Sequence, residues 1–160
     1  MRADAPYTGL QGIEQVIWVH KETSTAHDPL QGGLGPTRNG TRVLVVDDDP
    51  MSLEVLAVAL LEYGFSVRTA ASATEALAEA RRLPPALVLV DVLMPGIDGF
   101  QLCAALKDDP QLSAVPVVLL SADDGGPRDR ERGASVGAAD YLTKPIDLPG
   151  LVRVVRQLAA

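Results

Sequence analysis

Residues 44–50 read Leu-Val-Val-Asp-Asp-Asp-Pro, an apolar run that ends in three adjacent carboxylates. Adjacent like charges repel one another, and burial of an unpaired carboxylate is unfavourable. Two interpretations are open for Asp47, Asp48 and Asp49. They form a solvated turn after a strand, with one of them capping the next helix, or they form a cation site in which a metal ion removes the repulsion. The choice depends on the groups that other segments bring to the same place.

Length and composition restrict the classes of protein that fit. The chain has 160 residues, of which 47% are apolar, enough for one domain with a core. The net charge of −7 argues against direct contact with nucleic acid, which attracts basic proteins. The single cysteine, Cys103, excludes an intramolecular disulfide, and its apolar helical neighbourhood predicts a buried thiol. With no signal pattern and no apolar run near the roughly 20 residues of a membrane span, we expect a cytoplasmic protein without membrane insertion.

Two parts of the chain differ in composition. Residues 1–40 end in a Gly-rich stretch, LQGGLGPTRNG (30–40), that is typical of a flexible linker. We interpret residues 1–40 as an irregular N-terminal extension. Residues 41–160 have regular hydrophobic patterning and form the predicted domain.

In residues 41–160, short apolar runs alternate with segments of helical periodicity. The predicted strands are RVLVV, FSVRTA, ALVLV, VPVVLL and DYLT, at residues 42–46, 65–70, 86–90, 115–120 and 140–143. Each is followed by a predicted helix, within residues 50–64, 72–83, 98–109, 128–138 and 147–160. A capping box of Ser72 and Glu75 marks the start of the second helix. This alternation predicts a parallel, doubly wound five-stranded sheet with helices on both faces, an α/β three-layer sandwich.

Polar side chains follow four of the five predicted strands. Asp47 and its two neighbours follow the first strand, Asp91 the third, Ser121 the fourth and Lys144 the fifth. The carboxyl ends of parallel strands meet at one edge of a sheet, where ligands bind. Carboxylates suit a hard cation such as Mg²⁺, and a carboxylate can also act as a nucleophile that forms an acyl phosphate. A lysine and a hydroxyl at the same edge would neutralise and hydrogen-bond a phosphoryl group.

Four stretches carry a resemblance to a known family: VLVVDDDP (43–50), LVLVDVLMPGIDGF (87–100), VPVVLLSA (115–122) and DYLTKP (140–145). Together they resemble the response-regulator receiver domain of two-component signalling, and the resemblance covers residues 41–160. It implies a flavodoxin-like fold with strand order 2-1-3-4-5. It also implies that the protein is a phosphorylation-dependent signalling switch.

The resemblance assigns roles to the acidic residues. Asp91 would accept a phosphoryl group from the phosphohistidine of a histidine kinase. Asp48 and Asp91 would bind Mg²⁺ directly, with the backbone carbonyl of Leu93 as a third ligand, and Asp47 would hold the ion through water; Mn²⁺ is an alternative ion. Asp49 is left as the cap of the next helix. The alternatives are an ordinary turn acid at Asp91 and helix caps at Asp47 and Asp48.

The remaining strand ends also receive roles from the resemblance. Ser121 would hydrogen-bond the phosphoryl group together with the Ala122 N–H, and Lys144 would pair with another phosphoryl oxygen. Tyr141 would be the switch aromatic, which turns inward when Ser121 moves towards the phosphoryl group. Pro145 after the lysine matches the cis-peptide arrangement of the family. Without these roles, Lys144 would be an exposed lysine and Tyr141 a packed aromatic side chain.

Two stretches next to the expected site bear on its regulation. The resemblance places Leu93 beside the path of the water that hydrolyses the acyl phosphate. An apolar side chain cannot orient this water, so we expect slow self-dephosphorylation. The basic run Arg128–Arg132 is either a solvated helix face or a surface that binds a partner.

The sequence therefore predicts a receiver domain that catalyses its own phosphorylation with Mg²⁺ and is not an enzyme with an external substrate. Its expected partners are a sensor histidine kinase or a histidine phosphotransfer protein, and a downstream protein target; a homodimer is compatible with the sequence but not required by it. We expect a stand-alone regulator, a phosphorelay shuttle or a receiver fragment of a hybrid histidine kinase. The rivals are an unphosphorylated interaction module of the same fold and an aspartate-based hydrolase, which would need a carboxylate in place of Leu93.

Overall fold

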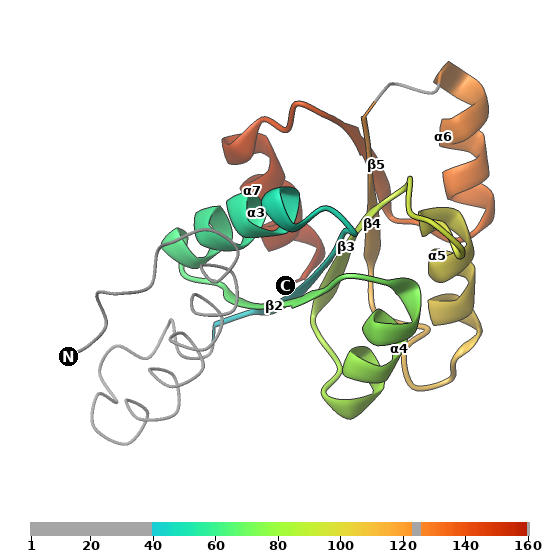
Figure 1. The fold of residues 1–160 in the computed structure, drawn as a ribbon, viewed down its shortest axis with the longest axis horizontal. Helices are drawn as coiled ribbons and strands as arrows, with labels where there is room; N and C mark the ends of the chain where they lie inside the picture. The colour runs from blue at the N-terminus through green and yellow to red at the C-terminus, as the bar shows by residue number, and fades with distance from the viewer. Residues whose placement is uncertain (1–39, 123–125, 160) are drawn as a thin grey trace.

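The computed structural model describes residues 40–122 and 126–159, which form one parallel sheet with helices on both faces (Figure 1). The strands are, in spatial order, β2 (Ser66–Ala70), β1 (Arg42–Val46), β3 (Leu87–Asp91), β4 (Val117–Ser121) and β5 (Asp140–Thr143). The helices are α3 (Pro50–Glu62), α4 (Ala73–Arg82), α5 (Gly99–Asp108), α6 (Gly126–Ser135) and α7 (Leu148–Leu158). The strand order confirms the predicted fold class.

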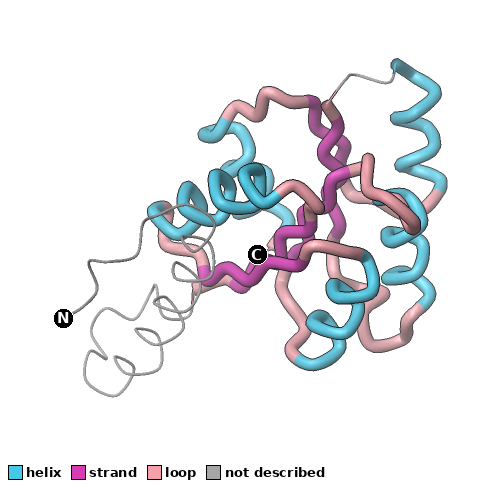
Figure 2. The backbone as a smooth tube through the Cα atoms, viewed as in Figure 1, coloured by secondary structure: helices cyan, strands magenta, loops and turns pink. Residues whose placement is uncertain are grey.

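The strands contribute side chains alternately to two apolar layers. Val43 and Val45 of β1 pack in a cluster with α3 and α7, whereas Leu44 and Val46 pack in a cluster with α4 and α5. Strands β1, β3 and β4 have buried residues on both faces because helices cover both sides of the sheet, as Figure 2 shows. This double burial explains why their sequences are continuous apolar runs rather than alternating ones.

Side-chain hydrogen bonds cap the N-termini of helices α3 and α4. The Asp49 carboxylate accepts from the amide of Ser52 at 3.3 Å and from its hydroxyl at 2.9 Å, so the third acid of the opening stretch caps α3, as predicted. The hydroxyl of Ser72 accepts from the Glu75 amide at 3.2 Å. The Glu75 carboxylate, however, accepts from the amide of Ala71 at 2.6 Å, one residue before the cap. The second half of the predicted capping box is therefore wrong, because the Glu75 side chain binds the amide of Ala71 rather than that of Ser72.

Cys103 on α5 is fully buried, which confirms the prediction of a buried thiol. Its Sγ donates to the carbonyl oxygen of Val136 at 3.4 Å. Burial disfavours the thiolate and raises the pKa of Cys103 to about 11. This side chain therefore acts as a small apolar residue in the layer between α5 and the sheet.

The predicted N-terminal extension, residues 1–40, lies outside the described residues except for Gly40, so it stays a prediction, and so do the domain boundaries. Within residues 40–122 and 126–159, none of the helices combines the length and the apolar character needed to cross a membrane.

Candidate functional site

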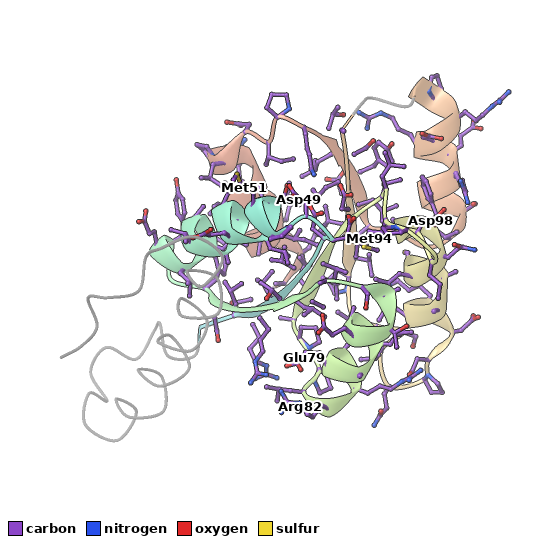
Figure 3. All side chains as sticks on the ribbon, in the orientation of Figure 1. Asp49, Met51, Glu79, Arg82, Met94 and Asp98 are labelled. Atoms are coloured by element: carbon purple, nitrogen blue, oxygen red, sulfur yellow. The ribbon has the colours of Figure 1, made fainter. Side chains whose placement is uncertain are left out.

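Three carboxylates meet at the carboxyl edge of the sheet. Asp47 follows β1 directly and Asp91 is the last residue of β3, and these two strands are neighbours in the sheet. Together with Asp48, each offers a carboxylate oxygen that lies within 4.8 Å of the others. Asp47 and Asp91 are buried, with 3% and 6% exposed surface, whereas Asp48 is exposed. Figure 3 shows Asp49 and Met94, which lie just beyond the ends of β1 and β3, at this same edge.

Lys144 places a positive charge between the two buried acids. Its Nζ lies 3.0 Å from Asp91 Oδ1 and 3.5 Å from Asp47 Oδ2. The other oxygen of Asp47 accepts a hydrogen bond from the Asp49 amide at 2.9 Å. The lysine comes from the end of β5, two strands away from β3, so the fold rather than the local sequence creates this contact. The structure thus brings together the acids and the amine predicted from the strand ends.

Burial and neighbouring charges shift the pKa values of Asp47 and Lys144. Burial raises the pKa of Asp47, and the negative charge of Asp91 acts in the same direction, against the opposing effects of the Asp49 amide and Lys144. Burial lowers the pKa of Lys144, but the hydrogen bond to Asp91 and the charges of both acids outweigh burial, so the net pKa is raised. Excess negative charge in a partly buried site favours the binding of a cation.

The fourth strand supplies a hydroxyl beside the acids. Ser121 is the last residue of β4, is buried, and lies next to the strand that carries Asp91. The backbone amide of Lys144 donates to the Ser121 carbonyl at 2.7 Å, which fixes the end of β5 to the end of β4. The Lys144–Pro145 peptide bond is cis, as the resemblance implied. Ala122, which is exposed, follows β4 directly.

The loop after β3 contains one expected site residue and one that the sequence analysis missed. Leu93 lies two residues beyond Asp91, and its side chain is 69% exposed. Gly99 begins α5 under the end of β3; a Cβ atom at this position would lie 2.6 Å from the Asp91 carbonyl oxygen and 2.7 Å from Val92 Cα. Only glycine allows so close an approach of two backbone segments. The signal was present in the Asp-Gly pair of the stretch 87–100.

Tyr141 on β5 is buried beside the site. Its ring stacks with that of Phe100 at a centroid distance of 6.5 Å, and 5% of the residue is exposed. Its hydroxyl is buried and has no hydrogen-bond partner among the described residues. A buried hydroxyl without a partner destabilises the arrangement that contains it.

We therefore expect Tyr141→Phe to raise the free energy of unfolding by about 1 kcal/mol, because phenylalanine removes the unpaired hydroxyl and keeps the ring. Urea denaturation of both proteins measures this change. Tyr63→Phe is the matched control, since Tyr63 is 40% exposed and, among the described residues, the buried unpaired hydroxyl is that of Tyr141. Equal stability of wild type and Tyr141→Phe would contradict the expectation.

The donor set fits a hard divalent cation. Carboxylate oxygens are the ligands that Mg²⁺ prefers, and three of them converge at this edge of the sheet. The exposed position of Asp48 leaves the cluster accessible from solvent. Both interpretations of residues 44–50 therefore apply, to different acids. Asp49 is a helix cap, and Asp47 and Asp48 belong to an acidic cluster compatible with a metal ion.

Comparison with known proteins identifies the class. Residues 43–156 match the family described as the response regulator receiver domain, and the chain belongs to this family. The chain is 37% identical over 119 residues to Protein PilH of Pseudomonas aeruginosa, a match that covers 74% of this chain and 98% of PilH. It is 47% identical over 117 residues to Response regulator PleD of Caulobacter vibrioides, a match that covers 73% of this chain but 26% of PleD. The chain therefore spans about a quarter of the length of PleD.

Solved structures show the same fold. The chemotaxis protein CheY4 of Vibrio cholerae is similar with a TM-score of 0.71 and 29% identity, over 74% of this chain and 98% of CheY4. The signal receiver domain of a signal transduction histidine kinase from Syntrophus aciditrophicus is similar with a TM-score of 0.69 and 36% identity, over 75% of this chain and 90% of that one. Residues 43–156 are thus a receiver domain of two-component signalling.

Proposed function

We propose that the protein is a phosphorylation-dependent switch in which Asp91 accepts a phosphoryl group from the phosphohistidine of a sensor histidine kinase or a histidine phosphotransfer protein. One observation carries the proposal: the buried Asp91 carboxylate lies 3.0 Å from Lys144 Nζ, within a cluster of three carboxylates. A structural aspartate at a strand end would not need both a lysine and further acids around it.

The transfer follows from the chemistry of the carboxylate. An oxygen of Asp91 attacks the phosphorus atom, a P–O bond forms as the P–N bond breaks, and the imidazole leaves with the electron pair. Lys144 already contacts an oxygen of Asp91 and would pair with a phosphoryl oxygen after transfer. Ser121, at the end of the neighbouring strand, would donate its hydroxyl to another phosphoryl oxygen, together with the amide of Ala122.

Asp47, Asp48, Asp91 and the carbonyl of Leu93 would hold Mg²⁺, with Mn²⁺ as an alternative. When bound, the ion supplies positive charge that offsets the repulsion between the acidic cluster and the incoming phosphoryl group. Asp47 is pinned by the Asp49 amide and by Lys144, which orients it for this role before any ligand arrives.

Phosphorylation would act through the region around β5 and α6, where Tyr141 is the expected switch aromatic. We propose that a downstream protein target in the cytoplasm recognises the altered surface. The receiver would act on this target as a monomer or as a homodimer. The protein would transfer the phosphoryl group to itself and hydrolyse it, without turnover of an external substrate. The match covers nearly the whole length of Protein PilH and also a receiver domain of a signal transduction histidine kinase, so we propose both a stand-alone regulator and a receiver of a larger kinase as contexts.

Incubation with acetyl phosphate and Mg²⁺, followed by intact-mass spectrometry, tests the phosphoacceptor. Wild type is expected to gain one phosphoryl group, about 80 Da, and Asp91→Asn to gain none. Asp108→Asn is the matched control, because Asp108 is an exposed acid on α5 outside the cluster, and this variant is expected to behave like wild type. Chelation of Mg²⁺ with EDTA is expected to abolish the gain in mass.

A folded wild-type protein that gains no mass and does not bind the phosphoryl mimic beryllofluoride would contradict the proposal. That result would favour the unphosphorylated interaction module of the same fold. Binding of beryllofluoride without a stable adduct would instead show that the acyl phosphate forms and hydrolyses quickly.

The lifetime of the acyl phosphate gives a separate prediction. The exposed, apolar Leu93 offers no hydrogen bond to an attacking water. We expect Leu93→Asn to hydrolyse the acyl phosphate about tenfold faster, because the amide can orient the water. Loss of the phosphoryl group is followed by mass after removal of acetyl phosphate. An unchanged half-life in Leu93→Asn would contradict the assigned role.

A further inference from the structure

Helix α6 packs on the domain without an apolar face, although it is ten residues long. Only Gly133 among its residues is buried, so the helix contributes almost no apolar side chain to the core. A helix in a protein is normally held by an apolar face, and α6 has none. Figure 1 shows α6 standing along the outer side of β5 and α5. Other contacts must therefore hold it there.

Two arginines of the basic run supply these contacts. The guanidinium of Arg130 lies 5.2 Å from the centroid of the Tyr141 ring, and that of Arg132 lies 4.2 Å from the centroid of Phe100. Both distances are in the range of favourable cation–π interactions. Arg132 also pairs with Asp98, the cap of α5, at 3.7 Å. Two side chains of the basic run thus contact the domain itself. Neither a solvated helix face nor a partner-binding surface, the two interpretations of the sequence, predicted these contacts.

Arg130 makes the contacts that reach the site. Its Nη1 donates to the carbonyl oxygen of Tyr141 at 3.2 Å, and its Nη2 donates to the hydroxyl of Thr143 at 3.4 Å. These residues are two apart on β5, the edge strand, which pairs with β4 alone in the described sheet. Arg130 therefore binds this edge strand at two positions, through the Tyr141 carbonyl and the Thr143 hydroxyl.

The same strand connects Arg130 to the phosphoacceptor. Lys144 follows Thr143 directly, donates its amide to the Ser121 carbonyl, and contacts Asp91 with its Nζ. A continuous set of contacts thus runs from α6 through Arg130 and β5 to Asp91. Tyr141 lies in the middle of this set, with an unpaired hydroxyl that by itself disfavours burial.

We propose that Arg130 is a positioning residue that holds Tyr141 in its buried orientation and couples the docking of α6 to the occupancy of Asp91. The planar guanidinium lies over the ring while one nitrogen donates to the Tyr141 carbonyl and the other to the Thr143 hydroxyl. The coupling part of this inference rests on the proposed phosphorylation of Asp91; the positioning part does not.

The positioning part is tested in the free protein. Selective ¹³C labelling of tyrosine, with Tyr141 assigned through Tyr141→Phe, allows the solvent exposure of this ring to be measured with a soluble paramagnetic agent. Arg130→Ala is expected to increase the exposed population of the ring about threefold. Arg130→Lys keeps the charge but loses the planar guanidinium with its two donors, and we expect a smaller increase for it. Arg128→Ala, an exposed arginine on the same helix, is the control and is expected to match wild type.

The coupling part is tested by titration of the same variants with beryllofluoride and Mg²⁺. Arg130→Ala is expected to bind the mimic about fivefold more weakly than wild type, with Arg130→Lys intermediate. An unchanged Tyr141 ring in folded Arg130→Ala overturns the positioning role, and an unchanged affinity overturns the coupling. If wild type itself fails to bind beryllofluoride, the phosphoacceptor proposal fails, and the ring measurement still decides the role of Arg130.

Discussion

Replacing Gly99 by alanine is expected to lower the free energy of unfolding by about 3 kcal/mol and to slow phosphorylation of Asp91. The added Cβ would lie 2.6 Å from the Asp91 carbonyl oxygen and 2.7 Å from Val92 Cα. Both neighbours are backbone atoms at the end of β3, so no side chain can move aside to accommodate the methyl group. Relief requires the end of β3 to shift, which displaces the phosphoacceptor itself.

Urea denaturation and the rate of mass gain with acetyl phosphate measure both parts of this prediction. Gly133→Ala is the matched control, because its Cβ would meet side chains and no backbone atom: Leu119 Cδ1 at 3.3 Å, Tyr141 Cδ2 at 3.4 Å and Phe100 Cε1 at 3.9 Å. Alanine also favours a helix relative to glycine, so we expect the control to lie within about 1 kcal/mol of wild type. A Gly99→Ala protein as stable and as readily phosphorylated as the control would contradict the account of the strand end.

Lys144→Met is expected to lower the free energy of unfolding by about 2 kcal/mol in the absence of metal. The substitution leaves the buried carboxylates of Asp47 and Asp91 without the cation that contacts both. Removing one partner of a buried ion pair commonly costs more than this, but the lysine side chain is 27% exposed, and water reduces the effect. Phosphorylation should also slow, because the ammonium group no longer neutralises the phosphoryl oxygens.

Addition of Mg²⁺ separates this electrostatic explanation from a packing defect. A divalent cation should restore more stability to Lys144→Met than it adds to wild type, because it replaces the missing positive charge. Lys144→Arg retains the charge and is expected to lose less stability than Lys144→Met. Equal losses in the two variants, with no difference in their response to Mg²⁺, would show that the charge of Lys144 is not what stabilises the cluster.

The sequence predicted the parts of the molecule that local patterns determine. Continuous apolar runs indicate strands buried on both faces, and their alternation with helices leaves few arrangements of the sheet. The acids, the hydroxyl and the amine were predicted together because each follows a strand, and parallel strands end at one edge. Asp47, Asp91, Ser121 and Lys144 therefore could be grouped without any knowledge of distances.

The features that were missed depend on contacts between distant elements. Gly99 is required because α5 begins against the end of β3; the Asp-Gly pair at residues 98–99 is a local signal, but it does not give this distance. Arg130 and Arg132 look like a solvated helix face, yet both lie over aromatic rings from other elements. The Glu75 carboxylate binds the amide of Ala71, and the capping-box pattern does not distinguish this amide from that of Ser72.

The central claim is that Asp91 becomes an acyl phosphate, and its position in the chain can be measured directly. The protein is treated with acetyl phosphate and Mg²⁺, reduced with borohydride, which converts a phosphorylated aspartate to homoserine, digested and sequenced by tandem mass spectrometry. We expect homoserine at position 91 and unmodified aspartate at Asp47 and Asp48, the other members of the cluster. Homoserine at either of those two positions, or at none of the three in a folded protein, would contradict the account.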